Sequence, residues 1–550
     1  MKTVKKRFVP LVVALGIVIG ILIGSFYANH FSGRRLNIIN NSNNKISNLL
    51  LLIDDQYVDT VNIDSLVEKS LPKILKELDP HSVYIGANDV NDAMQDLKGS
   101  FSGIGVRFNI YKDTVRIVSV IKGGPSEHVG LKAGDRIIAV NGEPYVGKQV
   151  SNETTIKKLK GEAGTQVRVK VKRAASAKPL EFKIVRGDVP VPTVDAVYMV
   201  NDETGYIRIS SFGETTYPEF LSALSQLREQ GFKKLILDLR GNLGGYMNTA
   251  VQIANEFLPQ GRLIVYTKGR KSRREDYRSD GRGSYQHMPV VVLVDESSAS
   301  ASEILAGAFQ DNDRGTVIGR RTFGKGLVQV PIEFPDGSMI RLTTARYYTP
   351  SGRCVQKPYT PGDEEDYDND LLLRAEHGEY YSADSIRLHG PKFKTRLGRT
   401  VYGGGGIVPD VFVPRDTLGF TSYFKEAYLA GLINSFAYAY VDGNRKVLEK
   451  KETLAALVAY LKRQNLVEQF ARFAEREGLK RRNRMIAASR KLIENYLMNG
   501  IIYDVLDLGA AVEYSNTNDP FMERALQALN EKNATQQSLE ALWEGGNDHA

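Results

Sequence analysis

The sequence predicts a multidomain α/β protein: an α/β core, an inserted β-rich module, a helical N-terminal lead-in and a helical C-terminal region. Its 550 residues exceed what one hydrophobic core holds, since domains average roughly 100 to 200 residues. Short β-branched runs fill residues 99–187, and strand-like and helix-like runs alternate between residues 206 and 349. With 42% hydrophobic and 25% charged residues, the composition is that of a globular protein.

The N-terminal segment differs from the rest of the chain. Residues 8–27 form an uncharged apolar run long enough to cross a bilayer, and four cationic residues precede it: Lys2, Lys5, Lys6 and Arg7. Because cationic flanks stay on the cytoplasmic side, residues 1–30 predict export of the remaining chain. We expect a signal anchor at the periplasmic side of the inner membrane, or a signal peptide whose cleavage leaves the protein in the periplasm.

Residues 45–98 predict a helical lead-in, because their apolar residues recur every three or four positions until Asp79-Pro80. The following module, residues 99–187, contains β-branched runs around one amphipathic stretch near residues 151–159. The core is expected at residues 188–415, with a polar inserted loop at 360–397 and a flexible hinge at residues 403–406. Helical periodicity returns in residues 419–535, and the C-terminal region 419–550 ends in a polar tail; a homodimer or an adaptor is a candidate partner for the helical regions.

Two glycine motifs in the β-rich module resemble a PDZ domain. The first is Ser102-Gly103-Ile104-Gly105-Val106, and the second runs from Gly123-Gly124-Pro125-Ser126 to Ala133-Gly134-Asp135-Arg136-Ile137 and Asn141-Gly142. The resemblance implies that Gly103, Ile104, Gly105 and Val106 bind a peptide, with backbone amides on its terminal carboxylate and an added strand beside the following residues. The alternative is a hairpin turn that needs glycine for its positive φ.

A serine cluster at residues 297–302 follows the apolar run 290–294, which predicts a buried strand, and precedes a helix expected at 299–309. Ser300 would then lie on the strand-to-helix turn, where free backbone amides can hold an oxyanion. A serine nucleophile needs a base. His287 is the one histidine close to Ser300 in sequence, but it precedes the strand, at the end opposite the turn.

Lys325 is the stronger candidate for the base. A lysine accepts a proton only when neutral, and lowering its pKa from about 10.4 to about 7 or 8 requires roughly 3 to 5 kcal/mol. Its neighbours are glycines and apolar residues, with no carboxylate for several positions, so an apolar pocket is expected to lower the pKa. Gln329 can hydrogen-bond the lysine nitrogen without adding charge, or it is an outward-facing strand residue.

These motifs together resemble the carboxyl-terminal processing peptidases, also called tail-specific proteases. The resemblance spans residues 45–415 and implies Ser300 as nucleophile, Lys325 as base and Gln329 as an assisting residue, on a crotonase/ClpP-like core. Further matching stretches are residues 78–82, 237–245 and 348–353. An amide of Gly244 or Gly245 would join that of Ala301 in an oxyanion hole worth about 3 to 4 kcal/mol per donor. Asp238 and Arg240 belong either to the active-site wall or to a structural ion pair.

The leading hypothesis is an exported serine endopeptidase that captures C-terminal tails of proteins through its PDZ-like module and cleaves by an acyl-enzyme mechanism. One alternative is a catalytically silent PDZ scaffold at the membrane, and another is an acyl-CoA hydratase or isomerase on the same type of core. We expect no metal and no cofactor, because the chain has a single cysteine, Cys354, and no His-Glu-x-x-His motif. No nucleic-acid partner is expected, because four charges of the net +9 belong to the N-terminal flank.

Overall fold

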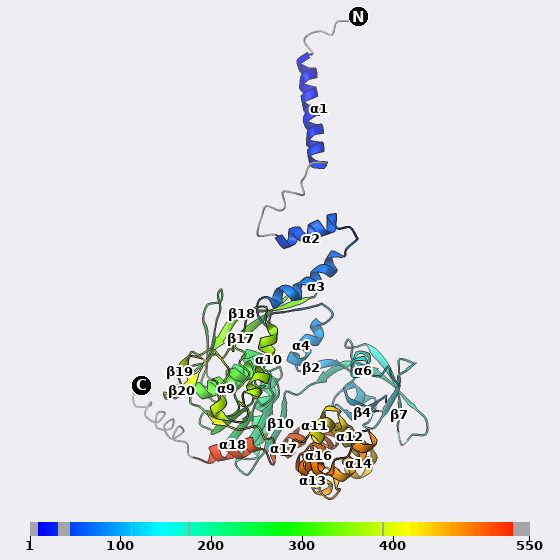
Figure 1. Ribbon diagram of the computed structural model, residues 1–550, viewed down its shortest axis with the longest axis vertical. Coiled ribbons are helices and arrows are strands. Elements are labelled where there is room, and N and C mark those ends of the chain that lie inside the picture. The colour runs from blue at the N-terminus through cyan, green and yellow to red at the C-terminus, as the bar shows by residue number, and fades with distance from the viewer. Residues whose placement is uncertain (1–8, 31–44, 112, 174–175, 388–389, 532–550) are drawn as a thin grey trace. The chain divides into compact units, whose positions relative to one another are not determined.

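The computed structural model describes residues 9–30, 45–111, 113–173, 176–387 and 390–531. They fall into two compact units, residues 1–75 and 76–550 (Figure 1). The cationic residues before the N-terminal apolar run and the polar C-terminal tail lie outside the described residues.

The first unit is helical, as predicted for this part of the chain. It contains α1 (Val9–His30), α2 (Lys45–Gln56) and nearly all of α3 (Ile63–Lys76). No helix among the described residues combines the length and the apolar character that a membrane crossing requires.

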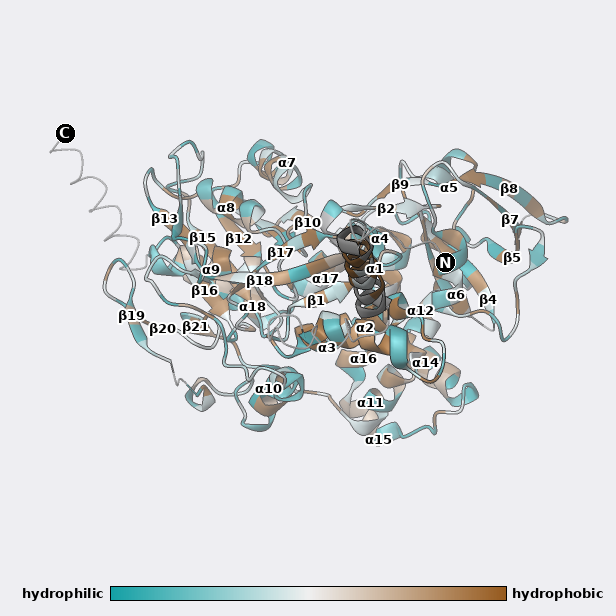
Figure 2. Ribbon diagram, turned by 90° about the horizontal axis from the view of Figure 1, so that it is seen from above, coloured by the Kyte–Doolittle hydropathy of each residue, from teal (hydrophilic) through white to brown (hydrophobic). Residues whose placement is uncertain are grey.

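The second unit is built on a six-stranded sheet, mostly parallel, with the order β10-β11-β12-β15-β16-β21. Its strands are β10 (Val194–Met199), β11 (Thr204–Ile209), β12 (Lys234–Asp238), β15 (Val290–Val294), β16 (Thr316–Gly319) and β21 (Val411–Phe412). All five residues of β15 are buried, and hydrophobic residues run through the central strands in Figure 2. A strand that reads as a continuous apolar run must be covered on both faces.

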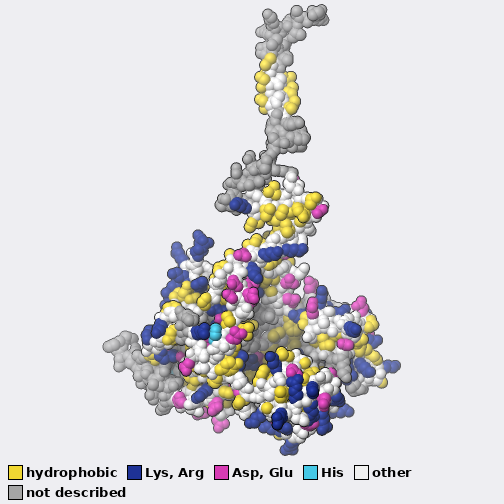
Figure 3. All heavy atoms as spheres, viewed as in Figure 1, with side chains coloured by type: hydrophobic (Ala, Val, Ile, Leu, Met, Phe, Trp, Pro, Cys, Tyr) yellow, Lys and Arg dark blue, Asp and Glu magenta, His cyan; other side chains and the backbone are white. Residues whose placement is uncertain are grey.

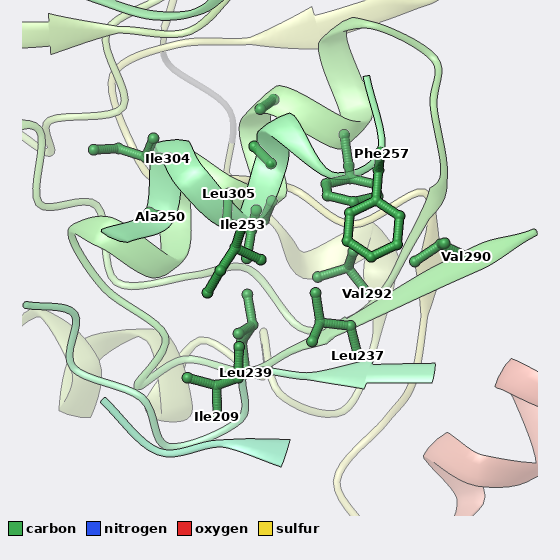
Figure 4. Packing of buried hydrophobic residues seen from close by; sticks show 14 of the residues in the cluster. Ile209, Leu237, Leu239, Ala250, Ile253, Phe257, Val290, Val292, Ile304 and Leu305 are labelled. Atoms are coloured by element: carbon green, nitrogen blue, oxygen red, sulfur yellow. The ribbon is translucent and has the colours of Figure 1, made fainter. Parts of the chain in front are cut away.

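Helices cover both faces of this sheet. On one face Leu237 and Val292 pack against α7 (Thr216–Glu229), α8 (Met247–Asn255) and α9 (Ala301–Asp311), as Figure 4 shows for α8 and α9. On the other face Ile236 and Val291 pack against α17 (Leu508–Asn516) and α18 (Pro520–Asn530). Two helices of the C-terminal region are therefore a layer of the core.

A second, antiparallel sheet carries the hairpin that follows Lys325. It joins β1 (Val83–Ile85), β18 (Met339–Tyr348), β13 (Leu263–Lys268) and β14 (Glu275–Arg278), and β17 (Leu327–Glu333) pairs with β18. The lead-in predicted as helical over residues 45–98 thus contains a short strand, β1, before α4 (Val90–Lys98). Its pairing with β18 ties residues 83–85 to the core.

The β-rich module begins and ends with two strands that pair with each other. Its sheet has the order β3-β4-β5-β7-β8, with β6 beside β5, and the pair β2 and β9 links its two ends. The elements are β2 (Ser100–Gly103), β3 (Val106–Tyr111), β4 (Thr114–Val120), α5 (Pro125–His128), β5 (Arg136–Val140), β6 (Glu143–Pro144), α6 (Asn152–Leu159), β7 (Gln166–Lys172), β8 (Leu180–Val185) and β9 (Gly187–Pro190). Valine and isoleucine side chains from β4, β5 and β7 form its own hydrophobic core.

The C-terminal helices also have a hydrophobic core of their own. They are α11 (Ser422–Leu429), α12 (Leu432–Leu448), α13 (Leu454–Leu461), α14 (Leu466–Arg476), α15 (Asn483–Ala488) and α16 (Arg490–Val505). Lys and Arg side chains gather over these helices in the view of Figure 3. Arginines of the β module pair with their carboxylates, since Arg107 lies 2.7 Å from Asp504 and Arg116 lies 3.0 Å from Asp442.

The segment predicted as a polar loop, residues 360–397, contains regular structure. It forms α10 (Glu364–Glu376), a short 3₁₀ turn (Ala383–Ser385) and β19 (Lys392–Lys394), which pairs with β20 (Thr400–Tyr402). The glycines predicted as a hinge, residues 403–406, are packed instead. The amide of Gly406 donates to the carbonyl of Val355 at 2.8 Å, and an added Cβ there would lie 2.5 Å from the Thr322 oxygen.

Candidate active site

Ser300 occupies the turn between β15 and α9, as the sequence predicts. It is the N-cap of α9 and has φ 54° and ψ −114°, a left-handed conformation that is strained for a residue with a Cβ. Its amide donates to Glu303 Oε2 at 3.0 Å, and its side chain is partly exposed. Backbone strain of this kind persists only where the surroundings enforce it.

Tyr347, on β18, joins the Ser300 turn to the loop that carries Lys325. Its hydroxyl donates to the carbonyl of Ser300 at 3.1 Å and to that of Lys325 at 2.7 Å. The ring is 1% exposed, so both contacts lie inside the protein. Residues 25 positions apart in sequence are thus held within reach of one hydroxyl.

Glu303 makes the second connection between the same two segments. Its buried carboxylate accepts the amides of Ser300 at 3.0 Å, Gly324 at 2.7 Å and Lys325 at 2.8 Å, together with the Thr322 hydroxyl. Burial raises the pKa of Glu303, while these four donors oppose that rise. The sequence analysis assigned no role to Glu303, although the Ser-x-x-Glu spacing of a helix capping box was a usable signal.

Replacing the Glu303 carboxylate tests whether it joins the Ser300 turn to the Lys325 loop. Glu303→Gln should destabilise the protein by about 1 to 3 kcal/mol, because an amide nitrogen would face donors in a buried site. Activity should fall by more than unfolding explains, since the Lys325 loop loses its anchor. Denaturant titration and turnover of the folded fraction measure the two effects. Equal stability and equal turnover would show that the carboxylate holds nothing essential.

The surroundings of Lys325 favour its neutral form. Burial lowers the pKa of the Lys325 ammonium, and the nearby Arg341 lowers it further, against weaker opposing effects of Glu303 and Asp79. Across the described residues, Lys325 Nζ takes part in no ion pair within 4.0 Å. A lysine in this setting gives up its proton more readily than one in water.

Gln329 lies on β17, and the structure gives its side chain a backbone partner. Gln329 Nε2 donates to the carbonyl of His81, which belongs to the stretch 78–82 matched in the sequence. That stretch is folded around Asp79, which accepts the amide of His81 at 2.9 Å and the Thr343 hydroxyl of β18 at 3.0 Å. Gln329 is therefore fixed beside the site, and its predicted contact with the lysine nitrogen stays a prediction.

The glycine turn that follows β12 lies directly against Ser300. A Cβ added to Gly244 would lie 2.6 Å from the Ser300 Cβ and 3.0 Å from the Ala301 nitrogen, so only glycine fits there. The Gly244 amide donates to Asn242 Oδ1 at 2.8 Å. The Gly244 amide is therefore occupied, and the role of Gly245 as oxyanion donor stays a prediction. Ala301 is the first residue of α9, whose amide has no intrahelical acceptor.

Other candidates have structural partners. Asp238 is buried and accepts from Arg240 Nε at 2.9 Å, and Arg240 also pairs with Asp519 next to α18. This network ties the C-terminal layer to the sheet, which favours the structural ion pair over the active-site wall. Burial raises the pKa of the Cys354 thiol, as expected for an unreactive cysteine. His287 precedes β15 and Ser300 follows it, so the two residues lie at opposite ends of this strand, which argues against His287 as the base.

The predicted peptide-binding loop connects β2 to β3. Ile104 is buried in the module's core, and Gly105 has φ 73° with Gly124 and Pro125 close by. β3 is the edge strand of its sheet. An edge strand offers unpaired backbone groups to an added peptide strand. Val106 is the first residue of this edge strand and Gly103 ends β2, so the four residues Gly103, Ile104, Gly105 and Val106 lead into the edge, and their binding of a peptide stays a prediction.

Comparison with known families agrees with this organisation. Residues 203–367 match peptidase family S41, and residues 116–173 match the PDZ domain. Residues 423–507, within the C-terminal helices, match a family of unknown function (DUF8443).

Comparison with individual proteins identifies relatives along most of the chain. A carboxy-terminal-processing protease of Bartonella bacilliformis is 34% identical over 66% of this chain and 82% of its own length. The carboxy-terminal processing protease CtpB of Bacillus subtilis is 34% identical over 63% of this chain and 70% of its own length. Among solved structures, a photosystem II D1 C-terminal processing protease is 27% identical, with a TM-score of 0.34 over 67% of this chain and 92% of that one. The chain belongs to the carboxy-terminal processing serine proteases of peptidase family S41, with a PDZ domain and helical regions at both ends.

Proposed function

We propose that the protease cleaves peptide bonds with Ser300 as nucleophile and Lys325 as general base. The observation that carries this proposal is the double connection of the two residues through Glu303 and Tyr347. Neutral Lys325 takes the proton from Ser300 Oγ as that oxygen attacks the substrate carbonyl carbon. The amides of Ala301 and Gly245 stabilise the resulting oxyanion.

In the later steps of the reaction, Lys325 gives up the proton that it took from Ser300. The C–N bond breaks as the Lys325 ammonium protonates the leaving amine, and an acyl-enzyme remains on Ser300. Water then attacks the ester carbonyl and gives a proton to Lys325. The acyl C–O bond breaks as Lys325 passes this proton to Ser300 Oγ, which releases the new C-terminal carboxyl group and regenerates the free serine and the neutral lysine. Gln329 supports this site from β17.

The substrates are proteins with accessible C-terminal tails, bound at the loop of Gly103, Ile104, Gly105 and Val106. A test protein with a flexible apolar tail should be cleaved, and the same protein with an amidated C-terminus should be cleaved more slowly at low concentration. The difference should appear in KM, because the amide removes the anion that the loop binds. Binding of the tail without any product would favour a silent PDZ scaffold instead.

We also propose that residues 1–30 direct the chain across the inner membrane, on the evidence of their uncharged apolar run and cationic flank. Alkaline phosphatase, which is active only after export, should gain activity when fused behind residue 30. A Lys2/Lys5/Lys6/Arg7→Glu variant should reduce this activity. An inactive wild-type fusion of normal abundance would refute export.

A further inference from the structure

Helix α10 lies on the loop that carries Lys325, although the sequence gives its segment no role. Arg374 is 3% exposed. Its Nη1 donates to the carbonyl of Thr322 at 2.8 Å, and its Nη2 donates to that of Phe323 at 3.1 Å. These carbonyls belong to the two residues before Gly324-Lys325. A planar guanidinium suits this pair of acceptors because its donors diverge at fixed angles.

The same face of α10 contacts His81, whose carbonyl is the hydrogen-bond partner of Gln329. Tyr367 is seven positions before Arg374, two turns earlier on the helix. Its hydroxyl lies 2.8 Å from His81 Nε2, and the carbonyl of His81 accepts from Gln329 Nε2. Burial is the largest cause of the low pKa of His81, about 4, so this imidazole is neutral at pH 7. One helix therefore contacts the Lys325 loop directly and Gln329 through His81.

Asp370 and Lys357 fasten the helix in place. Asp370 lies 2.9 Å from Arg374 and 3.2 Å from Lys357. Lys357 Nζ donates to the carbonyl of Tyr367 at 2.8 Å and lies 4.2 Å from the Phe323 ring centroid. Burying a guanidinium costs several kcal/mol, and apolar packing at such a site is often as stable. Fold stability alone thus gives little reason for an arginine here.

The side chains of Glu303, Gln356 and Arg374 hydrogen-bond the backbone of the loop of residues 322–326. Glu303 accepts the amides of Gly324 and Lys325, and Gln356 accepts that of Gly326 at 2.8 Å. Arg374 holds the carbonyls at the start of the loop. We propose that α10 holds the general base in position. Arg374 and Tyr367 are positioning residues: Arg374 fixes the Lys325 loop, Tyr367 fixes Gln329 through His81, and neither touches substrate. This inference rests on the proposed roles of Lys325 and Gln329.

The test is the variant Arg374→Ala in the full chain. Its kcat for a tailed protein should fall by about 10²-fold with KM unchanged, because a small displacement of the base impairs proton transfer but not tail binding. Added guanidinium ion, at concentrations that leave the wild type folded, should restore part of kcat by occupying the vacated site. Tyr367→Phe should show a smaller loss in kcat. Leu372→Ala, on an exposed part of the same helix, should match the wild type.

Hydrogen exchange separates this inference from the proposed function. In Arg374→Ala, the amides of Gly324, Lys325 and Gly326 should exchange faster while those of the central sheet are unchanged. Faster exchange in a protein whose wild type cleaves nothing would support the positioning role of α10 and refute the dyad. Wild-type kcat and exchange in folded Arg374→Ala would refute the positioning role and leave the dyad standing. A loss of kcat that guanidinium fails to restore would also refute it. If Arg374→Ala does not fold, Arg374→Lys and Tyr367→Phe decide by the same exchange and kcat criteria.

Discussion

Ser300→Ala should lower kcat for a tailed protein by about 10⁶-fold, because no other group can form the acyl-enzyme. The fold should be retained. Alanine keeps the Cβ that the turn at φ 54° already accommodates, and it keeps the amide that donates to Glu303 and the carbonyl that contacts Tyr347. Cleavage of a tailed protein, followed by gel electrophoresis and mass spectrometry, measures the loss.

Ser297→Ala provides the matched control, since Ser297 belongs to the same cluster but lies three residues before the N-cap of α9. It should cleave at the wild-type rate. A fluorophosphonate probe should label the wild type and Ser297→Ala but not Ser300→Ala. Turnover by Ser300→Ala within tenfold of the wild type would overturn the assignment of the nucleophile.

Lys325→Arg and Lys325→Met should each lower kcat by about 10⁴-fold or more, since both remove the base. Arginine has a side chain of comparable reach, but its guanidinium does not deprotonate at accessible pH. Its failure would show that a neutral amine is needed rather than a cation. Lys233→Arg is the control, because that lysine is exposed, forms an ion pair with Glu203 and carries no proton in the proposed reaction.

The pH profile tests the same residue in the wild type. Because the base works unprotonated, activity should rise as pH increases through the pKa of Lys325, which burial and Arg341 hold below its ordinary value of 10.5. Arg341→Gln removes a positive charge that disfavours the ammonium, so the pKa should rise and the acid limb should move to higher pH. An acid limb that moves to lower pH in Arg341→Gln would contradict this account.

Much of the site was predictable because its signals are short and contiguous. The apolar run 290–294 and the serines after it predicted a strand and a helix with Ser300 between them, and Ser300 is the N-cap of α9. Lys325 could be selected from its apolar neighbours, and burial does lower its pKa. The roles of Ser300 and Lys325 in catalysis stay predictions until the variants are measured.

The partners of Gln329 and of the Lys325 loop were not predictable in the same way. The hydrogen bond from Gln329 to His81 joins residues 248 positions apart, and that from Arg374 to Thr322 joins residues 52 positions apart. No local pattern encodes such contacts, since they depend on how β1 pairs with β18 and on where α10 packs. The segment of α10 is polar because its acidic residues are exposed or half-buried, while Arg374 is buried against backbone carbonyls, so its composition resembled a loop.

The sequence by itself determined the α/β class and the PDZ-like module and selected the residues proposed for the chemistry, because periodicity and short motifs are properties of neighbouring residues. Only the tertiary structure decided that α17 and α18 complete the core, that Glu303 and Tyr347 join the serine turn to the lysine loop, and that α10 rests on that loop. These features depend on packing between distant segments, where shape and hydrogen-bond satisfaction choose the partner.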